Sequence, residues 1–268
     1  MEVPVTGIDL KTTGLLGTIS RICDHPDRSG ILPWTNILAP LLVRLDNPAN
    51  TMQAPSGTQT AQRTIMTNHL YKNDLPDGLD LGPVVAIDCE TMGLNPHRDR
   101  LCVVQMSGGD GNAHLVQIEK GQTEAPNLCA MLENPEVLKL FHFGRFDIAA
   151  LYNAFGAVTA PVYCTKIASK LVRTYTDRHG LKFLLQELLG VDISKQQQSS
   201  DWGASALTEA QLDYAASDVL HLHRLKDALD LMLEREGRTD MAQACFDFLP
   251  MRARLDLAGW PEIDIFAH

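Results

Sequence analysis

The sequence has no apolar run long enough to cross a membrane, since none approaches the roughly 18 residues that a spanning helix needs. The most apolar early stretch, residues 31–45, is interrupted by Pro33, Asn36 and Pro40, and no basic segment precedes it. These absences argue against a secretory leader or a membrane anchor. They predict a cytoplasmic protein with no membrane partner.

Close cysteine pairs are also missing, because the six cysteines show neither a CxxC motif nor any other short spacing. Short spacings of this kind are typical of zinc sites and disulfide frameworks. The sequence therefore predicts buried, reduced thiols at all six positions, which are Cys23, Cys89, Cys102, Cys129, Cys164 and Cys245.

An excess of positive charge is the third absence, since 33 Asp and Glu residues outnumber 23 Lys and Arg residues and give a formal net charge of -10. Proteins that bind long nucleic-acid duplexes usually carry a basic face. A nuclease can still be acidic if metal ions supply positive charge and the substrate is short. Eight basic residues could form a local positive rim, although a solvated surface is their more ordinary role: Arg98, Arg100, Arg145, Lys166, Lys170, Arg173, Arg178 and Lys182.

Acidic residues are present in three separated motifs. Asp88 and Glu90 end the apolar run in VVAIDCETMGLNP, where strand alternation points both carboxylates to one face. Asp147 follows in FHFGRFDIAAL, and LDYAASDVL places Tyr214 one helical turn from Asp218. Four carboxylates brought together would repel one another unless cations neutralised them. An oxygen-only ligand set suits Mg²⁺ or Mn²⁺ rather than zinc.

Each of these residues has an ordinary structural alternative. An Asp at a strand end is most often a turn or cap residue, and a Tyr on a helix is most often part of the core. Their joint occurrence, each behind an apolar segment, favours a site for phosphodiester hydrolysis with two divalent cations. In this interpretation Asp88 bridges the ions, Glu90, Asp147 and Asp218 complete the ligand set, and Tyr214 orients or deprotonates the attacking water.

The chain divides into an N-terminal extension, residues 1–65, and a domain at residues 66–268. The extension has no sustained periodicity, so we expect a flexible and dispensable segment, or a start codon assigned too early with Met66 as the true start. The patterns that follow predict strands at 68–72, 84–89, 101–107, 113–118 and 137–141. They predict helices at 125–133, 145–155, 164–172, 181–189, 208–235 and 239–258, with a capping box at Thr208 and Gln211. This order predicts a single α/β domain with a mixed sheet flanked by helices.

The motifs DCETMGL, DYAASD, KQQQSSDW and the HF..FD segment at residues 142–147 resemble those of the DEDD superfamily of 3′ to 5′ exonucleases, in the branch with tyrosine in the third motif. Within it the chain is similar to ribonuclease D over residues 68–229. The resemblance implies an RNase H-like fold and an active enzyme. Two positions depart from the family: Phe143 lies where an asparagine is usual, and Ser199 where ribonuclease D often has arginine.

The length of the chain and its ending, LDLAGWPEIDIFAH, look more like the nanoRNase C family. That resemblance implies hydrolysis of short single-stranded RNA down to dinucleotides, and a homo-oligomer such as a ring-like octamer. It also suggests substrate-binding residues, with Leu94 between the terminal bases, Met92 and Phe146 stacked on bases, and polar residues on phosphate or sugar. The candidate set is Thr91, Met92, Leu94, His142, Arg145, Phe146, Lys195, Gln198 and Trp202; for Leu94, Phe146, His142 and Trp202 a structural role is the alternative.

Three functions stay open at this point. The first is the trimming of short oligoribonucleotides. The second keeps the chemistry but acts on structured RNA 3′ ends or on DNA, and the third is a non-catalytic scaffold, which would have no need of five reactive side chains. The apolar tail, residues 255–268, is expected to pack on another subunit, with folding back onto its own core as the alternative.

Overall fold

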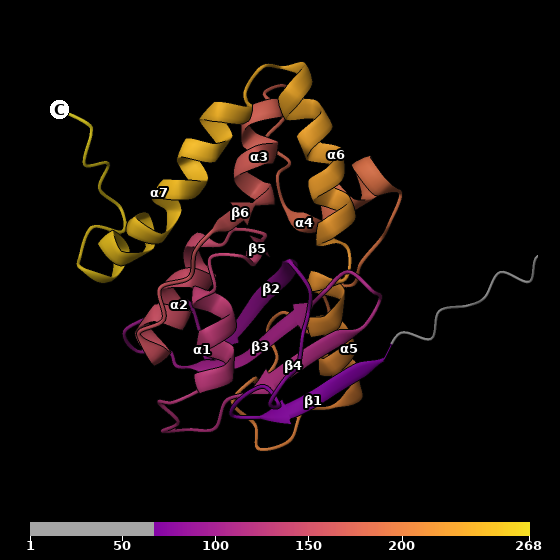
Figure 1. The fold of residues 1–268 in the computed structure, drawn as a ribbon, viewed down its shortest axis with the longest axis vertical. Helices are drawn as coiled ribbons and strands as arrows, with labels where there is room; N and C mark the ends of the chain where they lie inside the picture. The colour runs from indigo at the N-terminus through magenta and orange to yellow at the C-terminus, as the bar shows by residue number, and fades with distance from the viewer. Residues whose placement is uncertain (1–66) are drawn as a thin grey trace, which may run out of the picture. The chain divides into compact units, whose positions relative to one another are not determined.

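The computed structural model describes residues 67–268, so the predictions for residues 1–65 lie outside the described residues. The fold is built on a six-stranded sheet in the order β1-β4-β3-β2-β5-β6 (Figure 1). The strands are β1 (Asn68–Lys72), β2 (Val84–Thr91), β3 (Leu101–Ser107), β4 (Ala113–Gln117), β5 (Leu138–Phe141) and β6 (Val162–Cys164).

The sheet is mixed, as the sequence predicts. The strands β2, β3 and β4 pair antiparallel, whereas β1 pairs parallel to β4, and β5 pairs parallel to both β2 and β6. A tight turn joins β3 to β4 at the predicted GGDGN signal, where Gly109 and Gly111 have φ of 86° and 92°. Positive φ angles are accessible to glycine at little cost. The parallel step from β2 to β5 needs a longer crossover, which contains β3, β4 and helix α1.

The helices are α1 (Pro126–Glu133), α2 (Arg145–Phe155), α3 (Thr165–Val172), α4 (Leu181–Leu184), the π-helix η1 (Leu185–Leu189), α5 (Glu209–Val219), α6 (Leu222–Arg235) and α7 (Thr239–Leu257). Helix α5 packs against β1, β2, β3 and β4, and α2 packs against β2, β3 and α7 (Figure 1). The two helices that carry acidic motif residues therefore both lie beside β2, which carries the other two. The predicted single domain with helices around a mixed sheet is confirmed.

One element prediction is wrong, and one strand was not predicted. The single helix expected at 208–235 is two helices, because the chain breaks between Val219 and Leu222. The break lies at Leu220 and His221, and His221, with φ of -110° and ψ of -2°, is the N-cap of α6. The break lets α5 follow the sheet while α6 packs on α3. The strand β6 was not predicted, since three residues are too short to show a period.

The predicted capping box is present. The backbone N–H of Gln211 donates to Thr208 Oγ1 at 3.3 Å, and the backbone N–H of Thr208 donates to Gln211 Oε1 at 3.0 Å. Within residues 67–268 no helix is both long and apolar enough to span a bilayer.

The prediction of buried, reduced thiols holds for Cys89, Cys102 and Cys164, which are buried and free. Cys129 is free but only partly buried, and the prediction of burial is wrong for Cys245, which is free but exposed on α7. Cys23 lies outside the described residues.

Candidate active site

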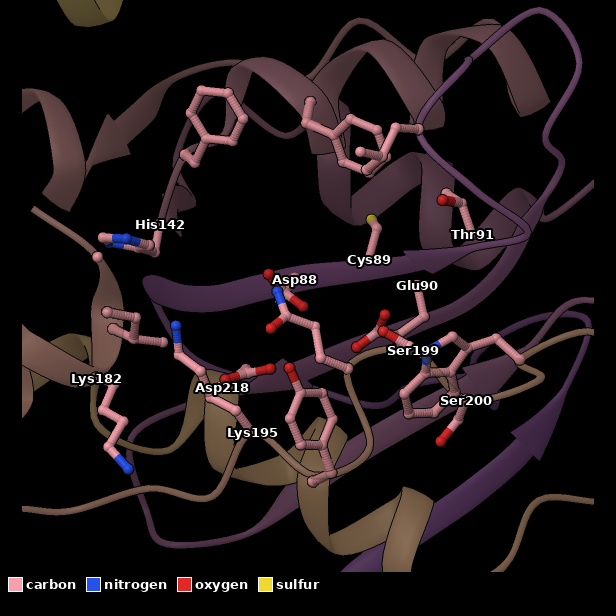
Figure 2. A pocket seen from close by; sticks show the side chains of 18 of the residues that line it. Asp88, Cys89, Glu90, Thr91, His142, Lys182, Lys195, Ser199, Ser200 and Asp218 are labelled. Atoms are coloured by element: carbon pink, nitrogen blue, oxygen red, sulfur yellow. The ribbon is translucent and has the colours of Figure 1, made fainter.

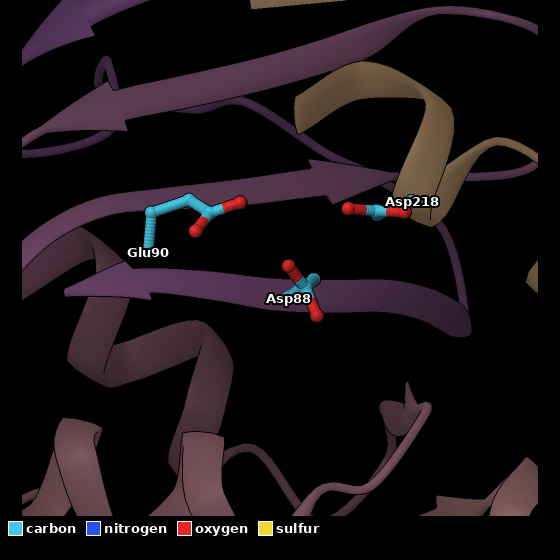
Figure 3. Close-up of side chains that lie close together, drawn as sticks. All are labelled: Asp88, Glu90 and Asp218. Carbon is cyan, nitrogen blue, oxygen red and sulfur yellow. The ribbon is translucent and has the colours of Figure 1, made fainter. Parts of the chain in front are cut away.

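Three of the four predicted carboxylates meet beside β2. Asp88 and Glu90 project from β2, and Asp218 reaches them from the last turn of α5 (Figure 3). One carboxylate oxygen from each lies within 4.8 Å of the others. The alternation of β2 and the packing of α5 on the sheet thus bring together residues 130 positions apart in the chain.

Asp147 lies next to this group of three but is not part of it. It lies in the first turn of α2 and is buried, and its Oδ1 accepts a 2.9 Å hydrogen bond from the Cys89 backbone amide. The second carboxylate oxygen has no such contact with Cys89 N. Burial is the largest cause of the raised pKa of Asp147, and the Asp218 charge raises it further, so the two carboxylates interact.

The electrostatics of the four acids fit a cation. Burial raises the pKa of Asp88 well above its ordinary value, and the charges of Asp147, Asp218 and Glu90 raise it further. Burial, followed by the charges of Asp218 and Asp147, raises the pKa of Glu90 to about 9. Burial also raises the pKa of Asp147 and of Asp218 to about 7. Carboxylates crowded in this way resist ionisation near neutral pH unless positive charge is supplied, and their oxygen atoms are ligands for Mg²⁺ or Mn²⁺.

Tyr214 lies one turn before Asp218 on α5, as its spacing predicts. A hydrogen bond from the phenol lowers the pKa of Asp218. Burial and the charges of Asp218, Glu90 and Asp88 raise the pKa of Tyr214 well above its ordinary value. The Trp202 ring packs on the phenol with centroids 6.0 Å apart. Without a cation the hydroxyl is therefore protonated, which suits a group that positions water rather than one that deprotonates it.

Asp88, Glu90 and Asp218 line a cavity of about 670 Å³. In Figure 2, His142 and Lys182 lie on one side of the labelled acids, and Ser199 and Ser200 lie on the other side. Eight of the predicted substrate-binding residues line this cavity: Thr91, Met92, Leu94, His142, Phe146, Lys195, Gln198 and Trp202.

Those eight residues differ in how they meet the cavity. Leu94 is 85% exposed, so packing does not explain its side chain, whereas Trp202 is 3% exposed and packs on Tyr214. His142 is partly buried, with Nδ1 2.9 Å from Thr165 Oγ1, and loss of solvent around the ring lowers its pKa to about 3. His142 is therefore a neutral imidazole. The roles of all eight in substrate binding stay predictions.

Arg145 is the ninth candidate, and it lies outside this cavity. Its guanidinium forms an ion pair with Asp256 of α7, with Nη2 2.7 Å from Oδ1. Nη2 also donates to the Pro261 carbonyl at 2.5 Å. Arg145 lines a second cavity of about 740 Å³, which shares Leu94, Phe143 and Phe146 with the first.

The structure adds residues that the motifs did not reveal. Gln105 donates to Asp88 from the middle of β3, and a polar residue inside an apolar strand was the available signal. Lys166 and Lys182, named only as part of a possible basic rim, line the cavity, and Lys166 Nζ lies 4.1 Å from the centroid of the Phe143 ring. Arg173, from the same rim, is instead fully buried and paired with Glu187.

Comparisons with known proteins agree with this geometry. A family model described as 3′-5′ exonuclease matches residues 62–234. A structure of Brucella melitensis NrnC with bound Mg²⁺ is 62% identical with a TM-score of 0.73, covering 76% of this chain and 100% of that one. The structure of Escherichia coli RNase D is 28% identical with a TM-score of 0.57, and the match covers 64% of this chain and 45% of that one.

Among curated relatives, ribonuclease D of Acidiphilium cryptum is 39% identical over 166 residues, which are 62% of this chain and 42% of the relative. The chain thus spans about two fifths of the length of that relative. The match of the family model covers more than half of the chain and contains every residue of the acidic motifs. The chain belongs to the 3′-5′ exonuclease family.

Proposed function

We propose that this exonuclease hydrolyses short oligoribonucleotides from the 3′ end, down to dinucleotides, and releases nucleoside monophosphates. The observation that carries the proposal is the partly buried group of Asp88, Glu90 and Asp218 at a cavity of about 670 Å³, a size typical of sites for small ligands. Two similar structures support it, since Brucella melitensis NrnC has been solved with bound Mg²⁺ and bound to pGG.

In the proposed reaction, water attacks the terminal phosphorus and the bond from phosphorus to the 3′ oxygen of the preceding nucleotide breaks. The water oxygen stays on the released nucleoside 5′-monophosphate, and a proton ends on the departing 3′ oxygen. Two divalent cations, when bound, would activate the water and stabilise charge on the phosphoryl and leaving oxygens.

The side chains of this chain have separate tasks in that reaction. Asp88 would be the ligand shared by the two cations, and Glu90, Asp218 and Asp147 would complete the ligand set. The protonated phenol of Tyr214 holds the attacking water through its oxygen and so fixes the direction of attack. Burial, followed by the charges of the neighbouring carboxylates, raises the pKa of this phenol when no cation is bound.

The remaining cavity residues would bind the nucleotides. Leu94 projects into solvent beside the acids and can separate two terminal bases, and Phe146 and Met92 offer apolar surface for stacking. Lys195 and Gln198 supply donors for phosphate or sugar oxygens. A substrate with few phosphates also suits a chain of net charge -10.

The alternative substrate is the 3′ end of a structured RNA, or DNA, and the curated ribonuclease D relatives favour the RNA form. The two are separated by turnover of labelled RNA and DNA of increasing length, from the dinucleotide upward, in Mg²⁺ or Mn²⁺. The proposal expects the highest kcat/KM on the shortest RNAs and none in Asp88→Ala or Asp218→Ala. Rates that rise with length would favour structured substrates, and turnover by purified Asp88→Ala would refute the site.

A homo-oligomer, such as the ring-like octamer expected above, and a cytoplasmic location complete the proposal. Its support is the apolar tail, where Trp260, Ile263 and Phe266 are 43%, 52% and 76% exposed. Light scattering on the full chain tests it, because a monomeric mass at the concentration used for activity would refute an oligomeric enzyme.

A further inference from the structure

Gln105 is a buried polar residue that the acidic motifs do not include. It lies in β3 between Val104 and Met106, which are fully buried apolar residues. The side chain of Gln105 is itself fully buried, and its Nε2 donates a 2.6 Å hydrogen bond to Oδ2 of Asp88. A buried amide is unfavourable unless it is hydrogen-bonded. The contact with Asp88 is therefore what makes a glutamine tolerable at this position.

The register of the sheet fixes this contact. In the antiparallel pair of β2 and β3, Gln105 lies directly opposite Asp88, so both side chains project from the same face. Glu90, two residues further along β2, projects from that face as well. The Gln105 amide lowers the pKa of both Asp88 and Glu90, which is the direction expected for a donor. One neutral donor group thus faces two carboxylates.

Packing does not explain why this residue is glutamine. Its Oε1 is buried and has no hydrogen-bond partner among residues 67–268. Buried polar atoms in folded proteins almost always have a partner, and a methionine of similar size would fill the space without this cost. The half of the amide that has a partner is the half that faces the acidic group.

We propose that Gln105 is a positioning residue of the exonuclease site. Its amide holds one oxygen of Asp88, which leaves the other oxygen turned toward Glu90 and Asp218 to meet a divalent cation. Because the amide is neutral, it orients the carboxylate without competing with the cation. A positively charged lysine at this position would compete. This inference rests on the metal-dependent function proposed above. Partners of metal ligands commonly contribute 10- to 100-fold to metal affinity or activity.

The test is titration of the full chain with Mn²⁺ alone, without nucleotide, by calorimetry. Gln105→Met should bind Mn²⁺ about 10- to 100-fold more weakly than wild type. The matched control is Ser107→Ala, on the same strand and face, which loses a buried 2.7 Å hydrogen bond to the Asn112 carbonyl. Ser107 lies opposite Ala86 rather than an acid, so the Mn²⁺ affinity of this control should equal that of wild type.

Steady-state kinetics and melting temperature distinguish positioning from simple stability. The inference expects Gln105→Met to lower kcat by a similar factor, with little change in KM and partial recovery at high Mn²⁺. A lower melting temperature with Mn²⁺ affinity within threefold of wild type would overturn it. If the methionine variant does not fold, Gln105→Asn keeps the amide but withdraws it by one methylene, and it must show the same loss of Mn²⁺ affinity. Wild type that binds Mn²⁺ but hydrolyses no oligonucleotide would refute the proposed function instead, and the comparison of Mn²⁺ affinities would still decide the role of Gln105.

Discussion

Glu90→Gln should stabilise the protein in the absence of metal while removing a metal ligand. One oxygen each of Asp88, Glu90 and Asp218 lies within 4.8 Å of the others. Two unit charges at that separation repel by about 3.5 kcal/mol at an effective dielectric constant of about 20. The substitution removes one of these charges and keeps nearly the same shape, so the gain arises without a new cavity.

The sign of the pH dependence follows from the direction of the pKa shift. Burial and the neighbouring carboxylates raise the pKa of Glu90 from 4.5 to about 9 in the folded protein. Between those two values the folded state binds more protons than the unfolded state, so the free energy of unfolding of wild type falls as pH rises. Glu90→Gln lacks this loss. At about 1.4 kcal/mol per pKa unit this shift sets an upper limit of about 6 kcal/mol. We therefore expect the free energy of unfolding of Glu90→Gln to exceed that of wild type by several kcal/mol near pH 9, and by less than about 1 kcal/mol near pH 5.

Thermal unfolding with a chelator, over a pH series, measures this difference. For a domain of this size each kcal/mol corresponds to about 2–4 °C in Tm. The control is Glu234→Gln, an exposed position on α6 with no ion pair among the described residues, which should follow wild type at every pH. Added Mn²⁺ should then raise the Tm of wild type more than that of Glu90→Gln. A variant that is less stable than wild type near pH 9 without metal would refute the electrostatic reasoning.

Four further predictions concern other parts of the chain. Tyr214→Phe should lower kcat by about 10²-fold with unchanged Mn²⁺ affinity, and a loss confined to KM would make the tyrosine a binding residue. Phe143→Asn should keep the free energy of unfolding or raise it by up to about 1 kcal/mol, because Phe143 has φ of 71°, a region that asparagine adopts more readily. A clearly lower free energy of unfolding in denaturant melts would show that packing of the phenyl ring dominates. Removing residues 1–65 should leave Tm and turnover nearly unchanged, and a large fall in Tm would reveal an integral element. Deleting residues 259–268 should reduce the mass seen by light scattering, whereas an unchanged mass would contradict the interface prediction.

The local part of the site could be predicted from the sequence because it depends on fixed periods. Asp88 and Glu90 share a face since strands alternate, and Tyr214 meets Asp218 since a helix repeats after 3.6 residues. Neither relation needs any knowledge of the tertiary fold. The same holds for the predicted strands at 68–72 and 101–107, whose bounds agree with β1 and β3.

The contacts that could not be predicted depend on register and on distant segments. Gln105 meets Asp88 only because β2 and β3 pair in one particular register, which the sequence does not state. The Asp147 carboxylate turns toward the Cys89 amide, so three carboxylates rather than four form the tight group. Arg145 matched a substrate contact by its motif, yet its ion-pair partner lies 111 residues further along the chain.

That distant ion pair also explains how the tail is held while its apolar side chains face outward. Asp256 accepts hydrogen bonds from Arg145 and forms an ion pair with Arg252, and both arginines donate to the Pro261 carbonyl. These contacts fix the backbone of the tail to α7 and to the first turn of α2 without burying the tail's side chains. Asp147 lies in that same turn of α2. A partner that covered the tail would therefore contact a segment held by Arg145, two residues from the predicted metal ligand Asp147. Loss of the tail is expected to lower enzymatic activity as well as the mass of the oligomer.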